Sequence, residues 1–335
     1  MPQIDLPLKE LRKYRGMNPC PPDFDRFWDA AVEEVYSIDP EPEFTPSDFS
    51  TDYARCFDLT FTGVGNVRIH VRYLKPLAAP GEGSKPDSSP ESSPDSSPAV
   101  LQFHGYTINA GDWFDKLPFA AAGFHVFAMD CRGQGGRSEA SPGLLDSTLR
   151  GHIIKGLEDG PEHLSYRHIF LDTVQLSRVA AATEGVDAGR MGAMGGSQGG
   201  ALTLACGALY PAIKRIVPMY PFLCDYKRVW DLDLGKQAYE EMVQFFKRFD
   251  PEHKREDEIF TTLGYIDVQF LAPRIQAEVL MCTNLMDEIC PPSTQFAAYN
   301  KIPGTKAMKI YPDYAHERPP EFMDHAFRFL TGLRE

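Results

Sequence analysis

The sequence lacks the features that mark several classes of protein. No stretch approaches the roughly 18 consecutive apolar residues of a membrane-spanning helix, and residues 1–7 have neither the basic segment nor the apolar run of a secretory signal. Basic residues are in deficit, with 34 Lys and Arg against 47 Asp and Glu and a formal net charge of -13. Such a balance argues against nucleic acid or an anionic membrane as a partner. We therefore expect a soluble, cytoplasmic protein.

Patterns that bind metals or form disulfide frameworks are also missing. The seven cysteines are odd in number and scattered, several of them within apolar runs, and no Cys-x-x-Cys or His-Glu-x-x-His pattern occurs. We expect reduced thiols in the core, no metal site and no cofactor.

The chain has enough apolar residues for one large domain. Of its 335 residues, 43% are hydrophobic and 12% are aromatic, which favours a single domain over residues 1–335. Residues 80–98 are the exception, because this segment consists mainly of Ser, Pro, Gly, Asp and Glu and repeats a Ser-Ser-Pro unit. We predict a disordered surface insertion there.

Strand and helix patterns alternate through most of the chain. A helix is predicted after Asp23, as its cap, and a hairpin is predicted from 54–62 and 67–73. Later strands are expected at 100–103, 125–129, 190–194, 215–219, 279–282 and 308–311, and helices at 113–122, 171–183, 198–209, 293–300 and 320–330. This order predicts an α/β fold with a mainly parallel sheet, helices on both faces and a helical N-terminal extension. Its active site should lie at the carboxyl ends of the strands.

The segment 195–200, Gly-Gly-Ser-Gln-Gly-Gly, contains a Gly-x-Ser-x-Gly pattern between a predicted strand and a predicted helix. A serine on such a sharp turn exposes its hydroxyl at the edge of the sheet, and the flanking glycines avoid Cβ clashes. We interpret Ser197 as a nucleophile. The backbone amide of Gln198, at the helix N-terminus, is then a candidate donor to an oxyanion.

A serine nucleophile needs a base, and the base needs an acid group that orients it. The loop after strand 279–282 offers Asp287, with Glu288 as the alternative, and the loop after the last strand offers His316. The resulting order of serine, acid and histidine is typical of α/β-hydrolases.

The early strand 100–103 leads into His104-Gly105-Tyr106, which favours the Tyr106 amide as the second oxyanion donor and His104 as a structural brace. Arg132-Gly133-Gln134 follows another strand without completing a phosphate-binding pattern. We interpret it as a structural turn near the site, in which Arg132 could pair with a carboxylate such as Glu317.

Together, Arg132-Gly133-Gln134, the glycine-flanked Ser197 and His316-Glu317 resemble the signature of carbohydrate esterase family 7, which contains acetyl xylan esterases and cephalosporin C deacetylases. The similarity runs from Asp23 to the segment 287–294, nearly the whole chain. The resemblance implies an acetylesterase acting on small acetylated substrates, such as xylo-oligosaccharides and cephalosporin C. It also implies a homo-oligomer, a hexamer in the family, and a role for Trp113 in the acyl pocket, although helix packing is an equal alternative for that residue.

Two competing functions stay open at this point. One is a hydrolase of the same fold with another acyl preference, such as a broad carboxylesterase, thioesterase or peptidase. The other is a non-catalytic ligand-binding protein, against which the full set of candidate catalytic residues argues.

Overall fold

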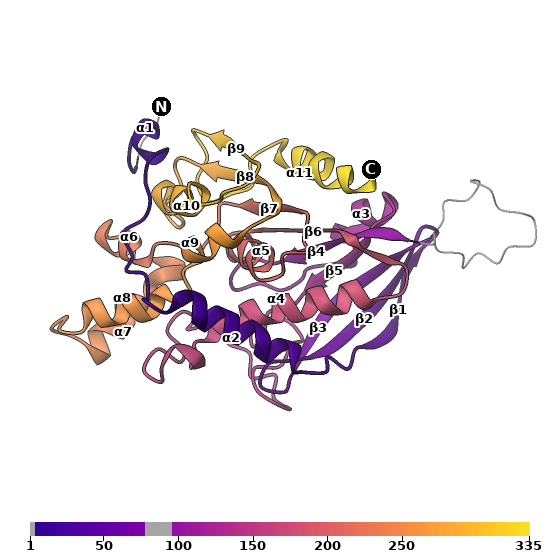
Figure 1. The fold of residues 1–335 in the computed structure, drawn as a ribbon, viewed down its shortest axis with the longest axis horizontal. Helices are drawn as coiled ribbons and strands as arrows, with labels where there is room; N and C mark the ends of the chain where they lie inside the picture. The colour runs from indigo at the N-terminus through magenta and orange to yellow at the C-terminus, as the bar shows by residue number, and fades with distance from the viewer. Residues whose placement is uncertain (1–3, 78–95) are drawn as a thin grey trace, which may run out of the picture.

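A computed structural model describes residues 4–77 and 96–335 of the chain (Figure 1). The described residues form a sheet of nine strands in the order β1-β2-β3-β5-β4-β6-β7-β8-β9. The bounds of the strands are β1 Glu43–Thr51, β2 Ala54–Gly63, β3 Val67–Pro76, β4 Ser97–Phe103, β5 His125–Met129, β6 Val186–Gly196, β7 Arg215–Met219, β8 Glu278–Asn284 and β9 Lys306–Tyr311. The sheet thus confirms the predicted α/β architecture.

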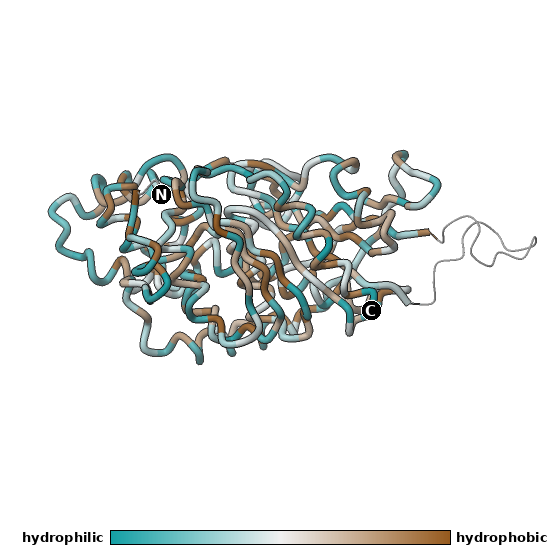
Figure 2. Tube along the Cα trace, turned by 90° about the horizontal axis from the view of Figure 1, so that it is seen from above, coloured by the Kyte–Doolittle hydropathy of each residue, from teal (hydrophilic) through white to brown (hydrophobic). Residues whose placement is uncertain are grey.

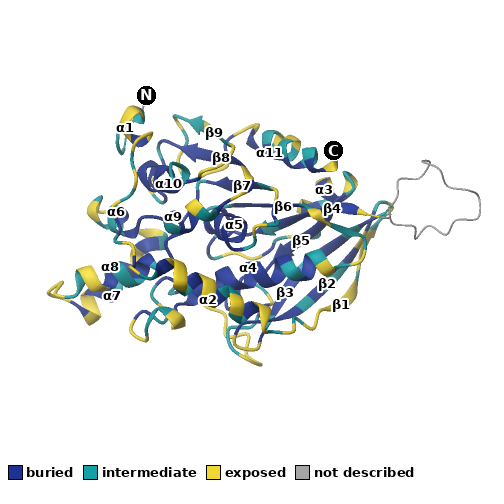
Figure 3. Cartoon of the chain, viewed as in Figure 1, coloured by how far each residue is buried: buried dark blue, intermediate teal, exposed yellow. Residues whose placement is uncertain are grey.

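One end of the sheet is antiparallel. The predicted hairpin is present, and β2 pairs with β3 from Ala54 opposite Pro76 to Gly63 opposite Val67. The sequence did not predict β1, which pairs with β2 at the sheet edge and is largely exposed, as the yellow ribbon of Figure 3 shows. An exposed edge strand lacks the apolar alternation that identifies a half-buried strand.

The rest of the sheet is parallel, from β5 through β4, β6, β7 and β8 to β9. The strand β4 begins at Ser97, and Ser97 and Pro98 are both buried. The predicted insertion at 80–98 is therefore wrong at its end, because these two residues extend a core strand whose first bridge joins Ser97 to Val186. Residues 80–95 of the prediction lie outside the described residues.

Helices cover both faces of the sheet. One face packs against α4 Ser165–Ala182 and α5 Gln198–Leu209, with α2 Phe24–Tyr36 packed on α4, and the other face packs against α3 Leu117–Ala121 and α11 Phe322–Thr331. The alternation along β4 explains this division, because Leu101 and Phe103 belong to the first core and Val100 to the second. In Figure 2, brown hydrophobic stretches accordingly run through the middle of the molecule.

Two predictions for the N-terminal helix had different outcomes. The helix α2 begins after Asp23 as expected and buries Trp28, but the Asp23 side chain makes no capping hydrogen bond. It accepts instead from the Tyr265 hydroxyl and from Arg26. The capping role was therefore wrong, because a tertiary partner takes the carboxylate.

A helical insertion, residues 220–277, separates β7 from β8 and contains α6 Tyr226–Asp231, η3 Gln237–Tyr239, α7 Glu240–Phe249, α8 Glu256–Gly264, α9 Val268–Leu271 and η4 Ala272–Arg274. Much of it projects beyond the sheet at the left of Figure 1. Smaller elements are α1 Leu8–Leu11, η1 Trp113–Lys116, η2 Pro161–His163, α10 Pro292–Tyr299 and η5 Gly332–Arg334.

All seven cysteines are free thiols, and six of them are buried, as predicted; Cys20 is exposed. Among the described residues, no helix combines the length and apolar character needed to cross a membrane.

Candidate active site

Ser197 occupies a strained turn between β6 and α5. Its backbone has φ 57° and ψ -118°, a conformation that L-residues rarely adopt. The turn depends on its glycines, because a Cβ at Gly195 would lie 2.5 Å from the Gly199 carbonyl oxygen and one at Gly200 would lie 2.6 Å from the Met219 oxygen. The predicted strand-turn-helix junction is thus present, and it holds the serine at the carboxyl end of the sheet.

The structure brings Ser197, His316 and Asp287 into one chain of hydrogen bonds. The His316 Nε2 atom lies 2.9 Å from Ser197 Oγ, and its Nδ1 atom lies 2.8 Å from Asp287 Oδ2. Since the carboxylate can only accept, Nδ1 carries the proton and Nε2 is free to accept from the serine hydroxyl. This is the arrangement in which an imidazole acts as a general base.

Of the two candidate carboxylates, Asp287 is the one that reaches the histidine. Its side chain is fully buried, and its Oδ1 atom accepts from the amides of Ile289 at 2.9 Å and Cys290 at 2.8 Å. Glu288, the alternative, is exposed. The two amides fix the carboxylate in place and leave Oδ2 to face the imidazole.

The histidine loop is held by a residue that the sequence did not single out. The Asn284 carboxamide, at the end of β8, donates to the carbonyl oxygens of Ala315 at 2.6 Å and Glu317 at 2.8 Å, on either side of His316. The Tyr220 ring packs edge-on against the imidazole, with centroids 5.1 Å apart. These contacts set the position of His316 from both the backbone and the ring.

Two backbone amides are available near the serine. Among the described residues, neither the Tyr106 amide nor the Gln198 amide has a hydrogen-bond acceptor. The Gln198 side chain is fully buried, and its Oε1 atom accepts from the Tyr166 hydroxyl at 2.7 Å and from Gln134 Nε2 at 2.9 Å. The predicted turn at 132–134 therefore contacts the site through Gln134.

Arg132 itself points elsewhere, and the suggested pairing with Glu317 is wrong. Its guanidinium forms a two-pronged ion pair with the fully buried Asp172 of α4, with Nε 2.7 Å from Oδ2. It also donates to the Val64 carbonyl oxygen at 3.0 Å. Burial raises the Asp172 pKa, and the adjacent Arg132 charge opposes that rise. Arg132 thus anchors the turn to the helix layer.

His104 fits the predicted structural role. Its Nδ1 donates to the Gly105 carbonyl oxygen at 2.7 Å, and its Nε2 accepts from the Cys131 amide at 3.0 Å. Both ring nitrogens are therefore used, and burial lowers the His104 pKa, which favours the neutral ring.

A cavity of about 420 Å³ opens beside the serine. Its walls come from the loop around Tyr106, the turn around Ser197, the helical insertion, the loops that carry Asp287 and His316, and Arg150. The lining residues include Ile108, Arg150, Met219, Tyr220, Gln237, Ala238 and Ile289. We call it the catalytic pocket.

Trp113, the expected wall of the acyl pocket, does not line the catalytic pocket. Its ring stacks on Phe49 with centroids 6.5 Å apart, and the Arg72 guanidinium lies 4.9 Å from its centroid. The structure therefore supports the packing alternative for this residue, because β1 and β3 cover its ring.

Comparison with known proteins gives a consistent result over the whole chain. The model of the family described as acetyl xylan esterase (AXE1) matches residues 1–333. The crystal structure of acetyl xylan esterase 1 from Thermoanaerobacterium sp. JW/SL YS485 is 51% identical, with a TM-score of 0.91 over 99% of this chain and 100% of that one. The chain belongs to the acetyl xylan esterase family.

Less similar proteins agree with this assignment or share the fold. An acetyl xylan esterase from Paenibacillus sp. R4 is 33% identical, with a TM-score of 0.87 over 98% of this chain and 99% of that one. An acetyl esterase of Xylanibacter ruminicola is 24% identical over 88% of this chain, which spans 63% of the length of that relative. A puromycin hydrolase, at 19% identity and a TM-score of 0.58 over 86% of this chain and 40% of that one, shares the fold. The family is one of ester hydrolases with the α/β-hydrolase fold.

A buried carboxylate joins the helical insertion of this esterase to the Tyr106 loop. Glu241 of α7 accepts from the Tyr106 hydroxyl at 2.7 Å through Oε1, and from the amides of Ile153 at 2.8 Å and Ile154 at 3.3 Å through Oε2. The Tyr106 hydroxyl in turn accepts from the His152 amide at 3.2 Å. Burial raises the Glu241 pKa, while the donors around it lower it. Glu241 thus ties together three segments that are far apart in the sequence.

We expect Glu241→Gln to lower kcat by about tenfold with little change in KM. The NH₂ group of the new glutamine would face one of the donors that the carboxylate now accepts from, and the Tyr106 backbone would shift. Steady-state kinetics on an acetyl ester would measure it. Tyr106→Phe should have a similar effect, and the double variant should lose less than the sum of the two. Glu252→Gln, a change on an exposed part of the same insertion, is the control. Additive effects, or a change confined to KM, would show that the bond does not position Tyr106.

Asp287, Cys290 and His316 offer ligand atoms that all lie within 4.8 Å of one another. The carboxylate and the imidazole are already hydrogen-bonded to each other, and the imidazole is also bonded to Ser197. Two of the three groups of this cluster are therefore already bonded within the chain from Ser197 to Asp287.

Proposed function

We propose that this protein is a serine esterase that removes acetyl groups from small acetylated sugars, such as xylo-oligosaccharides, and from acetyl esters of the cephalosporin C type. The single observation that carries the proposal is the chain from Ser197 through His316 to the buried Asp287, with hydrogen bonds of 2.9 and 2.8 Å. Membership of the acetyl xylan esterase family supports the acyl group.

In the first half of the proposed reaction, Ser197 Oγ attacks the acetyl carbonyl carbon while its proton passes to His316 Nε2. The Asp287 carboxylate stabilises the imidazolium. The carbonyl oxygen becomes an oxyanion, which in this proposal accepts hydrogen bonds from the amides of Tyr106 and Gln198. Collapse of the intermediate breaks the bond to the alcohol oxygen, which takes the proton from His316 and leaves the acetyl group on the serine.

In the second half, a water molecule gives a proton to His316 and attacks the acetyl-enzyme. The second tetrahedral intermediate releases acetate and restores the serine hydroxyl. The proposed chemistry uses only side chains and backbone amides of this chain, so we propose that neither a metal nor an organic cofactor takes part.

The acyl group and the size of the substrate test the proposal. We expect acetyl esters to be hydrolysed more efficiently than butyryl or octanoyl esters of one alcohol, and acetate to be released faster from small acetylated sugars than from insoluble xylan. The measurement is kcat/KM for each matched pair, with Ser197→Ala to subtract background hydrolysis.

Equal efficiency on octanoyl esters would support a broad carboxylesterase instead, and a preference for thioesters would support a thioesterase. The expected discrimination against insoluble xylan rests on the proposal that the single domain assembles into a homo-oligomer, a hexamer by analogy with the family. Rapid attack on the polymer, together with a monomer in sedimentation experiments, would contradict that assembly.

A further inference from the structure

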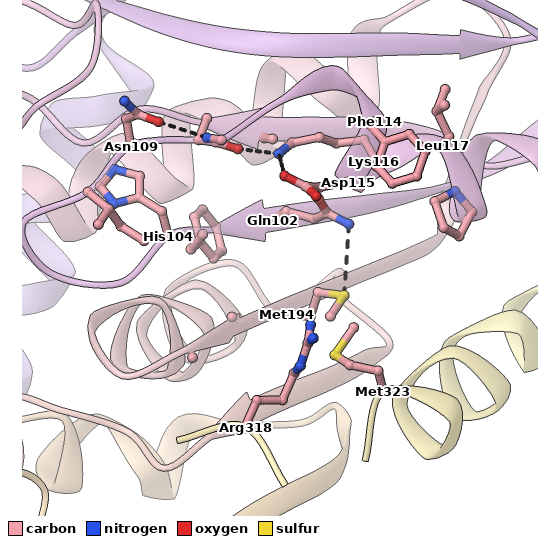
Figure 4. A pocket seen from close by; sticks show the side chains of 18 of the residues that line it. Gln102, His104, Asn109, Phe114, Asp115, Lys116, Leu117, Met194, Arg318 and Met323 are labelled. Atoms are coloured by element: carbon pink, nitrogen blue, oxygen red, sulfur yellow. Dashed lines mark hydrogen bonds and ion pairs between the residues drawn. The ribbon is translucent and has the colours of Figure 1, made fainter. Parts of the chain in front are cut away.

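A second cavity lies beside the catalytic pocket and has no part in the proposed reaction. Its volume is about 820 Å³, and it lies between the carboxyl ends of β4 and β6, the loop that leads into η1, and the segment around Arg318 (Figure 4). It shares Ile108, Gly196 and Met219 with the catalytic pocket. Gly196 directly precedes Ser197, so both cavities border the turn that carries Ser197. We call this space the Arg318 cavity.

Three hydrogen-bond donors of the Arg318 cavity have spare capacity. The Arg318 guanidinium forms no hydrogen bond or ion pair with any described residue. The Lys116 ammonium, whose side chain is 5% exposed, donates to the Ala110 carbonyl oxygen, and its nearest carboxylate, that of Asp115, is 3.9 Å away. The Gln102 carboxamide has only a long contact of 3.9 Å with the Met194 sulfur. In Figure 4, Gln102 lies between Lys116 and Arg318.

The charge of these groups selects the ligand. A guanidinium and an ammonium can only donate, and both favour an anionic acceptor such as a carboxylate. Asp115 is the one acidic residue among those that line the cavity, and its side chain is 63% exposed at the rim. Among the residues that line the cavity, two cationic groups thus face one carboxylate at the rim, although the protein as a whole is acidic.

The remaining walls are mostly apolar. They include the side chains of Ile108, Phe114, Leu117, Met194, Met219 and Met323. Phe114 is 74% exposed and Ile108 is 57% exposed, and large apolar side chains grouped at a cavity mouth are typical of a binding surface. A small inorganic anion would leave these walls in contact with water. A carboxylate with an apolar body would cover them.

We propose that the Arg318 cavity binds small organic monocarboxylates with an apolar body, holding the carboxylate at Arg318, Lys116 and Gln102 and the hydrocarbon against the apolar walls. The site is distinct from the catalytic pocket, and binding does not depend on hydrolysis. Because the occupant would contact Gly196, it would lie against the backbone of the nucleophile turn.

Binding of hexanoate, measured by titration calorimetry on the full-length protein, tests the proposal. We expect Arg318→Gln to weaken hexanoate binding by about tenfold, because one charge-assisted hydrogen bond is lost. Hexan-1-ol, which lacks the carboxylate, should likewise bind the wild-type protein less tightly than hexanoate does. Arg328→Gln is the matched control, because this exposed arginine of α11 does not line the cavity. Its affinity for hexanoate should equal that of the wild type.

A second measurement separates the two cavities. Phenylmethanesulfonyl fluoride should occupy the catalytic pocket by modifying Ser197, and hexanoate should still bind the modified protein with unchanged affinity. Ser197→Ala should also bind it normally, so a failure of the proposed hydrolysis would not affect this result. Loss of binding after modification, or equal affinity of wild type and Arg318→Gln, would overturn the proposal. Since Arg318 is exposed and unpaired, its replacement should leave the fold intact, which a melting curve would verify.

Discussion

Ser197→Ala and His316→Ala should each reduce kcat on an acetyl ester by roughly 10⁴- to 10⁶-fold, because groups that act as a unit lose nearly all of their effect when one is removed. The two residues are joined by a hydrogen bond of 2.9 Å, and no other described imidazole lies within hydrogen-bonding distance of the serine. The double variant should be no slower than the single variants. Purified proteins and initial rates of acetate release would provide the measurement.

The rest of the molecule provides the controls for this experiment. His325→Ala changes a histidine on α11 that is only partly buried, and it should leave kcat within about twofold of the wild type. Melting curves would establish that each variant is folded. More than about a tenth of the wild-type rate in either Ser197→Ala or His316→Ala would refute the assignment of nucleophile and base.

Asp287→Asn should have the second largest effect, a loss of roughly 10³- to 10⁴-fold in kcat with little change in KM. An amide cannot stabilise the imidazolium by charge, and its NH₂ group can turn toward Nδ1 and favour the wrong tautomer. The two backbone amides that bind Oδ1 would hold the asparagine oxygen and leave the nitrogen facing the histidine. Initial rates with saturating and limiting acetyl ester would separate kcat from KM.

Glu288→Gln is the matched change for Asp287→Asn, since it neutralises the exposed carboxylate of the next residue. We expect it to retain nearly full activity. If Glu288→Gln were damaging and Asp287→Asn mild, the acid group of the site would be Glu288 and not Asp287.

The parts of the fold that could be predicted from the sequence are those that buried apolar residues define locally. The strands β5 and β7 and the helix α5 have the predicted bounds, because each is an almost wholly buried apolar run. The edge strand β1 gave no comparable local signal. The helical insertion did carry one that the prediction missed, because Met242, Phe245 and Phe246 of α7 follow the i, i+3, i+4 spacing of a helix face and are buried. In β1, phenylalanines alternate irregularly with exposed polar residues, and its pairing with β2 depends on a neighbouring strand.

The same distinction applies to the site. Ser197, Asp287 and His316 could be located because each follows a predicted strand, and parallel strands bring their carboxyl ends together. The contacts of Glu241 and Asn284 could not be, because each joins segments whose distance in space is set by the whole fold. Tyr106 and Glu241 are 135 positions apart. The carboxylate partner of Arg132 was predicted wrongly for the same reason, since Asp172 reaches the guanidinium from the helix α4.

The helical insertion supplies part of the pocket wall of this esterase, and this bears on how its specificity could evolve. Ser197, Asp287 and His316 all lie on turns that follow strands of the sheet, whereas the insertion contributes Tyr220, Gln237 and Ala238 to the wall of the catalytic pocket. A lineage could therefore change which alcohols it accepts by exchanging this one segment while the reactive groups stay in place. Glu241 limits that freedom. Any replacement segment would have to keep the contacts of the insertion with the rest of the chain, among them the acceptor for the Tyr106 hydroxyl and the Asp225 carboxylate that binds the amides of Met17 and Asn18.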